Sequence, residues 1–226
     1  MKKVNYYKIN YSVDKKITGA KDSQIINFID PENNSVERTK KYSYIGLDHV
    51  DSSLDFTKFK ADDKAKVTDI LSSNFFSSYY IISEKFKKII EDFTFHNVRF
   101  LDSVVTFKNN KYNYFILSII ERIDIVDFSK STLILDRVSP MLRFGGDIIE
   151  VTSSEDYSLK SAKIWDEKGF GYGLIPTQIV LNYRSDLVKL PFGITLISEE
   201  LKQKIEEEKL TGIVFEKTES EFYLKD

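Results

Sequence analysis

Residues 81–100 read IISEKFKKIIEDFTFHNVRF and residues 196–215 read LISEELKQKIEEEKLTGIVF, so the chain contains one pattern twice. The two stretches align without a gap, and seven of their twenty positions are identical. Ordinary residue usage would give roughly one or two identities. We interpret the pattern as a duplicated unit within a larger domain. The identical pairs are Ile82/Ile197, Ser83/Ser198, Glu84/Glu199, Lys87/Lys202, Ile90/Ile205, Glu91/Glu206 and Phe100/Phe215.

Each copy predicts a strand, a helix and a second strand. Ser83 and Ser198 precede the helical pattern, where a serine oxygen accepts hydrogen bonds from the free amides of the first turn. Asn97 and Gly212 follow the helices at equivalent places, and both residue types tolerate the left-handed conformation that commonly ends a helix. The apolar triplets after them predict short strands.

The two predicted helices differ in their apolar faces. The first carries a full stripe at helical spacing, formed by Phe86, Ile89, Ile90 and Phe93. The second keeps only Leu201 and Ile205, so we expect it to be more exposed. In the strands that follow, we expect Phe100 and Phe215 to be buried.

The composition is that of a soluble globular protein. Of the 226 residues, 42% are hydrophobic and 30% charged, and 13 Tyr and 17 Phe favour strands. The absence of Cys excludes disulfides and suits a reducing cytoplasm. The alternating start MKKVNYYKINYS predicts no signal peptide, and the longest apolar run, residues 114–120, is too short to span a bilayer. The net charge of −2 gives no sign of nucleic-acid binding.

We therefore expect one α+β domain over residues 1–226, with a β-rich portion at 1–74, a mostly antiparallel sheet and two equivalent strand–helix–strand units. Residues 108–111, with two asparagines, predict the turn of a hairpin. Short helices are predicted at 62–71 and 161–168. Strands are predicted at 4–13, 24–29, 54–59, 123–128, 132–138, 147–152 and 178–183, and turns at 30–34 and 145–146.

No motif for catalysis, metal binding or cofactor binding is apparent. The segment GFGYG at 169–173 departs from the dinucleotide fingerprint in spacing, and no helical pattern follows it, so we interpret it as a loop. The two histidines, His49 and His96, are too few for a metal site. One enzyme alternative can be assembled, because Arg38, Ser131–Thr132 and the pair Glu219 and Glu221 occur in the order that ADP-ribosyltransferases use.

Three stretches together resemble the bacterial polymorphic-toxin immunity family numbered eleven. Residues 79–101 contain the Ser-started helix between two strands, and residues 112–131 are similar to the family's paired strands ending in an Asp-x-x-x-Ser corner. Residues 194–216 include a Leu-Thr-Gly-x-x-Phe ending. The likeness spans residues 75–217, whereas residues 14–74 show no clear match.

The resemblance implies a cytoplasmic protein that binds and neutralises a secreted bacterial toxin domain, often a nuclease, without catalysis. It implies a protein partner, no cofactor, and no direct contact with nucleic acid or membrane. The alternatives are the ADP-ribosyltransferase-like enzyme and a structural or adaptor module. A cleft with convergent polar groups would favour the enzyme, and an apolar patch without acidic neighbours would favour the adaptor.

A toxin-contact surface is the final expectation from the sequence. Protein interfaces concentrate their binding energy in Trp, Tyr and Arg. The single tryptophan, Trp165, precedes the glycine-rich loop and has acidic neighbours. We expect this region and the acidic second helix to face the toxin, with contacts from Trp165, Asp166, Phe170, Tyr172, Glu199 and Glu206.

Overall fold

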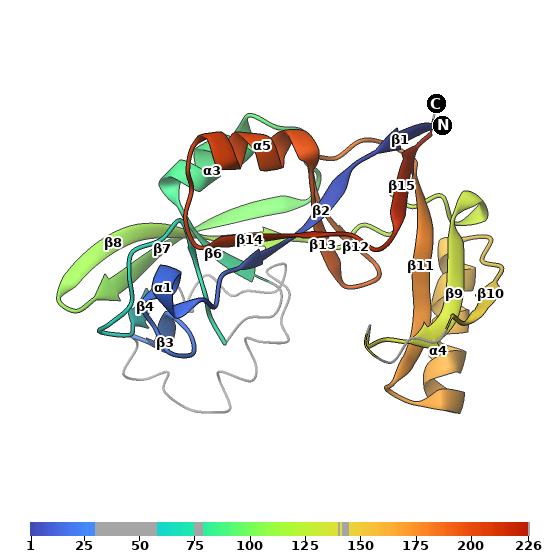
Figure 1. Cartoon of the computed structure of the whole chain (residues 1–226), viewed down its shortest axis with the longest axis horizontal. Helices are drawn as coiled ribbons and strands as arrows, with labels where there is room; N and C mark the ends of the chain where they lie inside the picture. Colours follow the sequence, from blue (N-terminus) through green and yellow to red (C-terminus); the bar gives the residue numbers. More distant parts are fainter. Residues whose placement is uncertain (30–57, 75–78, 140, 142–144, 226) are drawn as a thin grey trace. The chain divides into compact units, whose positions relative to one another are not determined.

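The computed structural model describes residues 1–29, 58–74, 79–139, 141 and 145–225 (Figure 1). Strands predominate in this part of the chain, and four α-helices accompany them. The strands form three sheets, and most neighbouring strands are antiparallel. The structure confirms an α+β fold with mostly antiparallel pairing. The predicted turn at 30–34, most of the predicted strand at 54–59, and His49 lie outside the described residues.

The described chain divides into two compact units, each assembled from separate segments. The α4 unit comprises Met1–Lys8, Glu121–Glu199 and Glu216–Asp226. The α3 unit comprises Ile9–Ile120 and Glu200–Phe215. The single domain expected over residues 1–226 stays a prediction.

The α4 unit contains a five-stranded sheet with a long helix packed on its central strand. The strand order is β1 (Lys2–Val4), β15 (Glu221–Leu224), β11 (Tyr172–Leu181), β9 (Thr132–Arg137) and β10 (Asp147–Ile149). Helix α4 (Ser154–Lys168) begins at Ser153, whose Oγ accepts from the Asp156 amide at 3.2 Å. Ile164 of α4 is buried, and the Tyr157 ring stacks on Phe128 with centroids 5.1 Å apart.

A four-stranded sheet has the order β12 (Leu187–Leu190), β13 (Ile194–Ser198), β2 (Tyr6–Tyr11) and β14 (Ile213–Lys217). Helix α5 (Glu199–Glu207) connects β13 to β14. It buries only Leu201 and Ile205, at 0% and 1% exposure, whereas α3 (Glu84–Glu91) buries three apolar side chains. The left-handed residue at the end of α5 is Lys209, at φ 54°, and Gly212, at φ 81°, is left-handed in the loop that follows.

The α3 unit contains a six-stranded sheet. The strand order is β3 (Ile25–Phe28), β4 (Lys58–Ala61), β7 (Val98–Phe107), β8 (Asn110–Ile119), β6 (Tyr79–Ser83) and β5 (Ile70–Leu71). The predicted hairpin is present, with Lys108 at φ 55° in its turn. A short helix, α1 (Lys15–Thr18), ends at Gly19. Figure 1 shows α3 (Glu84–Glu91) beside α5, and the Lys85 ammonium donates to the Glu208 carbonyl.

Helix α3 begins as its sequence predicted. The Ser83 hydroxyl oxygen accepts from the Phe86 amide at 3.1 Å, and Asn97 adopts a left-handed φ of 55°. The helix ends at Glu91, so Phe93 lies just beyond it, and Phe86, Ile89 and Ile90 form the buried stripe. The serine contact confirms the cap expected for the first copy. The expected stop is wrong, because the C-terminal cap residue, Asp92, is in a right-handed conformation and the left-handed Asn97 lies in the loop beyond it.

Two predicted elements are wrong. Residues 62–71 form no helix, because their backbone bonds distant segments: the Gln24 carboxamide donates to the Lys66 carbonyl, and the Ile70 amide donates to the Thr211 carbonyl. Residues 123–128 form no strand, because Ile125 and Val126 are buried in a turn that leads into the 3-10 helix Phe128–Lys130. Their apolar character reflects burial of a loop.

Two further details differ from the predictions. The helical turn expected at 161–168 is the second half of the longer helix α4. Phe100 and Phe215 are half-buried, and each ring lies 5.5 Å from a lysine ammonium, that of Lys87 and that of Lys202 respectively. The amphipathic lysine stem and its charged end cover each ring, and a cation near an aromatic face is attracted to it.

Candidate functional site

A pair of exposed aromatic rings lies where α4 ends. Trp165 is 57% exposed and Phe170 is 84% exposed, and their ring centroids are 5.7 Å apart in an edge-to-face arrangement. Gly169, at φ 74°, ends the helix, and its amide donates to the Trp165 carbonyl at 2.9 Å. The backbone reversal at Gly169 therefore brings the loop residue Phe170 back against the last turn of the helix.

Tyr172 continues this surface at the start of β11. Its half-buried ring has two cations near it, the Arg137 guanidinium at 5.2 Å from the centroid and the Lys168 ammonium at 5.5 Å. We call Trp165, Phe170 and Tyr172 the aromatic corner. Together with the exposed Asp166, it contains four of the six residues that the sequence suggested for contact, whereas Arg137 and Lys168 had no signal in the sequence.

The two glutamates of the predicted surface have local partners. Glu199, the first residue of α5, accepts from the Asn5 amide group at 2.7 Å and belongs to the α4 unit. Glu206 belongs to the α3 unit and forms an ion pair with Lys202 at 2.7 Å. Of the six predicted contact residues, Glu206 alone lies in a different unit from the aromatic corner.

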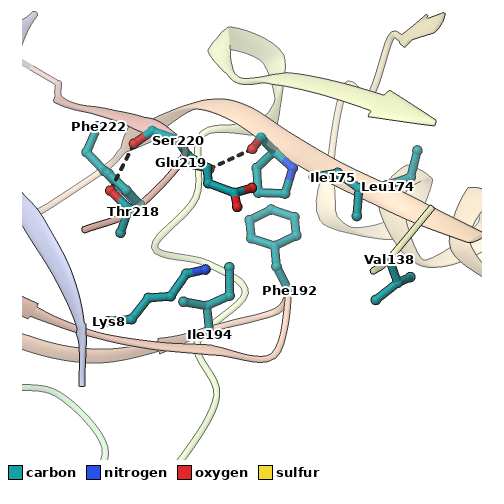
Figure 2. Close-up of a pocket in the computed structure, with 11 residues that line it drawn as sticks. Lys8, Val138, Leu174, Ile175, Phe192, Ile194, Thr218, Glu219, Ser220 and Phe222 are labelled. Atoms are coloured by element: carbon teal, nitrogen blue, oxygen red, sulfur yellow. Dashed lines mark hydrogen bonds between the residues drawn. The ribbon is translucent and has the colours of Figure 1, made fainter. Parts of the chain in front are cut away.

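A hole of about 230 Å³ opens in the α4 unit (Figure 2). Its apolar lining includes the buried side chains Leu174 and Phe222, at 6% and 2% exposure. Figure 2 shows Lys8 and Glu219 directed into the same space. No motif in the sequence pointed to this hole, because its lining comes from distant segments: Lys8, Val138, Leu174, Ile175, Pro176, Phe192, Ile194, Thr218, Glu219, Ser220 and Phe222.

Two hydroxyl groups in the wall of the hole form hydrogen bonds to backbone carbonyls of the wall itself. The Ser220 hydroxyl donates to the Pro176 carbonyl at 2.6 Å, and the Thr218 hydroxyl donates to the Ser220 carbonyl at 3.0 Å. These bonds, drawn in Figure 2, fix the turn between β14 and β15 against β11. The ends of the hole are therefore held in place before any partner arrives.

The charged clusters of the α4 unit support the fold. Hydrogen bonds from Arg122 and Tyr183 hold the pKa of Asp124 at about 2, below the usual value of 3.8. Asp127 is buried with an ion pair to Lys225 at 3.0 Å, and its pKa is lowered chiefly by the hydrogen bond from Ser129. Each group is satisfied by residues of its own cluster.

The transferase alternative gains nothing from the geometry. Arg38 lies outside the described residues. The Ser131 hydroxyl bonds only backbone groups here: it donates to the Asp127 carbonyl and accepts from the Val180 amide. Glu221 is held by Lys3 at 2.6 Å and by the Tyr223 hydroxyl.

The described residues offer neither a metal site nor a membrane-spanning helix. Within those residues, His, Asp and Glu side chains nowhere gather in a group of three that could hold a metal ion. The helices described in Figure 1 include none with the length and apolar character needed to cross a membrane.

Comparison with known proteins gives a family. No curated protein matches the chain. A family model described as an immunity protein family matches residues 5–173, about three quarters of the sequence. The match includes residues 14–74, where the sequence showed no clear likeness, and it ends before the predicted stretch at 194–216. Immunity proteins of this kind are typically not catalytic, which agrees with the prediction that the chain is not an enzyme. The chain belongs to the immunity protein family (Imm11).

Proposed function

We propose that this immunity protein binds its cognate toxin domain through the aromatic corner and thereby neutralises the toxin. Family membership implies toxin neutralisation. The observation that favours this surface is the exposed Trp165–Phe170 pair, because large aromatic side chains left in water are costly unless a partner covers them. Tyr172 and Arg137 beside it are residue types that dominate interface energies.

The acidic residues next to Trp165 favour a basic partner such as a nuclease. Asp166 is exposed, and Glu167 follows it with its carboxylate 3.7 Å from Lys163. The cations Arg137 and Lys168 lie at Tyr172, the other end of the corner. A separate acidic stretch in the sequence, residues 199–208, carries five glutamates against two lysines. Acidic surfaces raise association rates with the positively charged sites that nucleases present to nucleic acid. A nuclease acting inside the cell would place the protective complex in the cytoplasm.

The test is co-expression with the toxin domain encoded beside this chain. We expect the double substitution Trp165→Ala and Phe170→Ala to abolish protection and to weaken binding at least a hundredfold, since each side chain is a candidate anchor. Leu159→Ala is the matched control, because Leu159 is 73% exposed on the same helix but has no part in the aromatic corner.

Reversing one charge of the surface provides a second, independent test of the proposed contact. Asp166→Lys should slow association and make it less sensitive to salt, if the toxin surface is basic. Full protection and unchanged binding in Asp166→Lys, in Tyr172→Ala and in the aromatic double variant would show that this surface is the wrong one.

We also infer that the two helical copies are equivalent units of one duplicated element. Each copy lies in a run of four neighbouring strands with the same arrangement. The strand order is β5–β6–β8–β7 in one sheet and β12–β13–β2–β14 in the other. Helix α3 connects β6 and β7, which flank β8, and helix α5 connects β13 and β14, which flank β2. In each copy the lysine of the helix pairs with a glutamate and lies over a phenylalanine ring: Lys87, Glu91 and Phe100, and Lys202, Glu206 and Phe215.

Hydrogen bonds support the same equivalence beyond the aligned stretches. The Ser83 amide donates to the Asp69 carbonyl at 2.8 Å, and the Ser198 amide donates to the Asp186 carbonyl at 2.9 Å. Just before these aspartates, the Thr68 and Ser185 carbonyls each accept from a buried tyrosine hydroxyl, at 2.8 and 2.7 Å. The tyrosines are Tyr114 on β8 and Tyr6 on β2, which lie opposite Ser83 and Ser198.

A further inference from the structure

Lys8, which lines the hole, differs in character from the residue at the same position of the other copy. Ile81 pairs with Ile116 across β6 and β8, and the equivalent Leu196 pairs with Lys8 across β13 and β2. Ile116 is 0% exposed and belongs to the core of the α3 unit. Lys8 therefore stands where the other copy has a fully buried isoleucine.

The consequence is an incompletely filled core in the α4 unit. Leu174 and Phe222 belong to that core and also line the hole, so apolar surface faces an unfilled space beside Lys8. Among the described residues, the Lys8 ammonium has neither a hydrogen bond nor an ion pair. Apolar core surface left uncovered lowers stability, which is typical of sites kept for binding.

The hole also adjoins the aromatic corner. Val138 lines the hole and is 51% exposed, and its amide donates to the Gly171 carbonyl at 3.0 Å. Gly171 lies between Phe170 and Tyr172 in the chain. A partner that covers the corner therefore reaches the opening of the hole without leaving the α4 unit.

We propose that the hole receives an apolar side chain of the toxin domain, carried next to a carboxylate that pairs with Lys8. This inference rests on the proposed function and deepens it. The apolar floor suits an aliphatic or aromatic side chain, since removing such a side chain from water is favourable. The Lys8 ammonium attracts a neighbouring carboxylate, whereas the Glu219 carboxylate, directed into the same space, repels one. The two charges therefore orient the entering segment, with its carboxylate on the Lys8 side.

The experiment uses the full chain and the purified toxin domain encoded beside it, with affinity measured by calorimetry. Lys8→Ile gives the second copy the residue of the first. We expect binding at least tenfold weaker, together with a melting temperature equal to or above that of the unsubstituted protein. Ile194→Trp, which fills the hole, should weaken binding at least as much. Ile148→Trp is the matched control, because Ile148 is 72% exposed on β10 and does not line the hole.

The outcomes separate the two proposals. If the unsubstituted chain binds the toxin and both Lys8→Ile and Ile194→Trp bind with unchanged affinity, the hole is not a contact and the proposed function stands. If the unsubstituted chain does not bind the toxin, the proposed function fails and this inference fails with it. If Ile194→Trp does not fold, the affinity and melting temperature of Lys8→Ile decide alone.

Discussion

The first helical stretch (β6–α3–β7) and the second (β13–α5–β14), which we infer to be copies of one unit, both follow a serine and both contain a Lys–Glu–Phe cluster, but they are buried differently. Helix α3 buries three apolar side chains, whereas α5 buries two. Asn97 is exposed after α3, whereas Gly212 is buried after α5. The difference teaches that one sequence pattern specifies a local unit, and that its neighbours decide how much of the unit is covered.

Asp69 shows how the copies meet. Its carboxylate accepts from the Ser83 hydroxyl at 2.8 Å and, through the other oxygen, from the Thr211 amide at 2.8 Å. It thereby connects the cap of α3 to the loop that follows α5. Asp186, which we infer to be its counterpart, forms an ion pair with Arg184 at 3.0 Å, two residues earlier in the chain.

The largest effect is expected from truncating the helix anchors. Phe86 and Leu201 occupy equivalent positions and are 1% and 0% exposed. Phe86→Ala should lower the free energy of unfolding by about 3–5 kcal/mol, and Leu201→Ala by about 2–5 kcal/mol, because each leaves a cavity in a packed interior. Denaturant unfolding measures both, and losses below about 1 kcal/mol in either would contradict the burial described here.

A smaller effect should separate the two left-handed loop residues that follow the helices, Gly212 and Asn97. Gly212→Ala should destabilise by about 1–3 kcal/mol, because φ is 81° and the added Cβ would lie 2.2 Å from the Ile70 carbonyl oxygen. Asn97→Gly, at the exposed equivalent, should change stability by less than about 1 kcal/mol. Thermal unfolding of both variants tests the contrast, and equal losses would mean that the tight approach at Gly212 is not real.

The smallest effect concerns the caps. Ser83→Ala should cost about 1 kcal/mol, because the Phe86 amide and the Asp69 carboxylate both lose a hydrogen bond. Ser198→Ala should cost a similar amount if the second serine caps α5 as the first caps α3. Chemical denaturation of the two variants compares them, and a neutral Ser198→Ala would restrict the capping role to the first copy.

The sequence predicted the parts of the fold that depend on local chemistry. A serine before a helical stripe and two asparagines at a hairpin act within a few residues, so they were found without the tertiary structure. Residues 62–71 were misread because the apolar spacing of a short segment does not show that its amides bond Thr211. The candidate contact side chains were chosen by type, and their exposure was found only in the folded chain.

The sequence by itself determined the α+β class, the cap of α3, and the resemblance to an immunity family. The tertiary structure decided which strands lie beside the copies, because strand pairing depends on contacts between distant segments. It therefore decided that Lys8 lies opposite Leu196 in the place of a buried isoleucine, and that Trp165 meets Phe170 across Gly169. A side chain's neighbours follow from register and packing, and no local pattern fixes either.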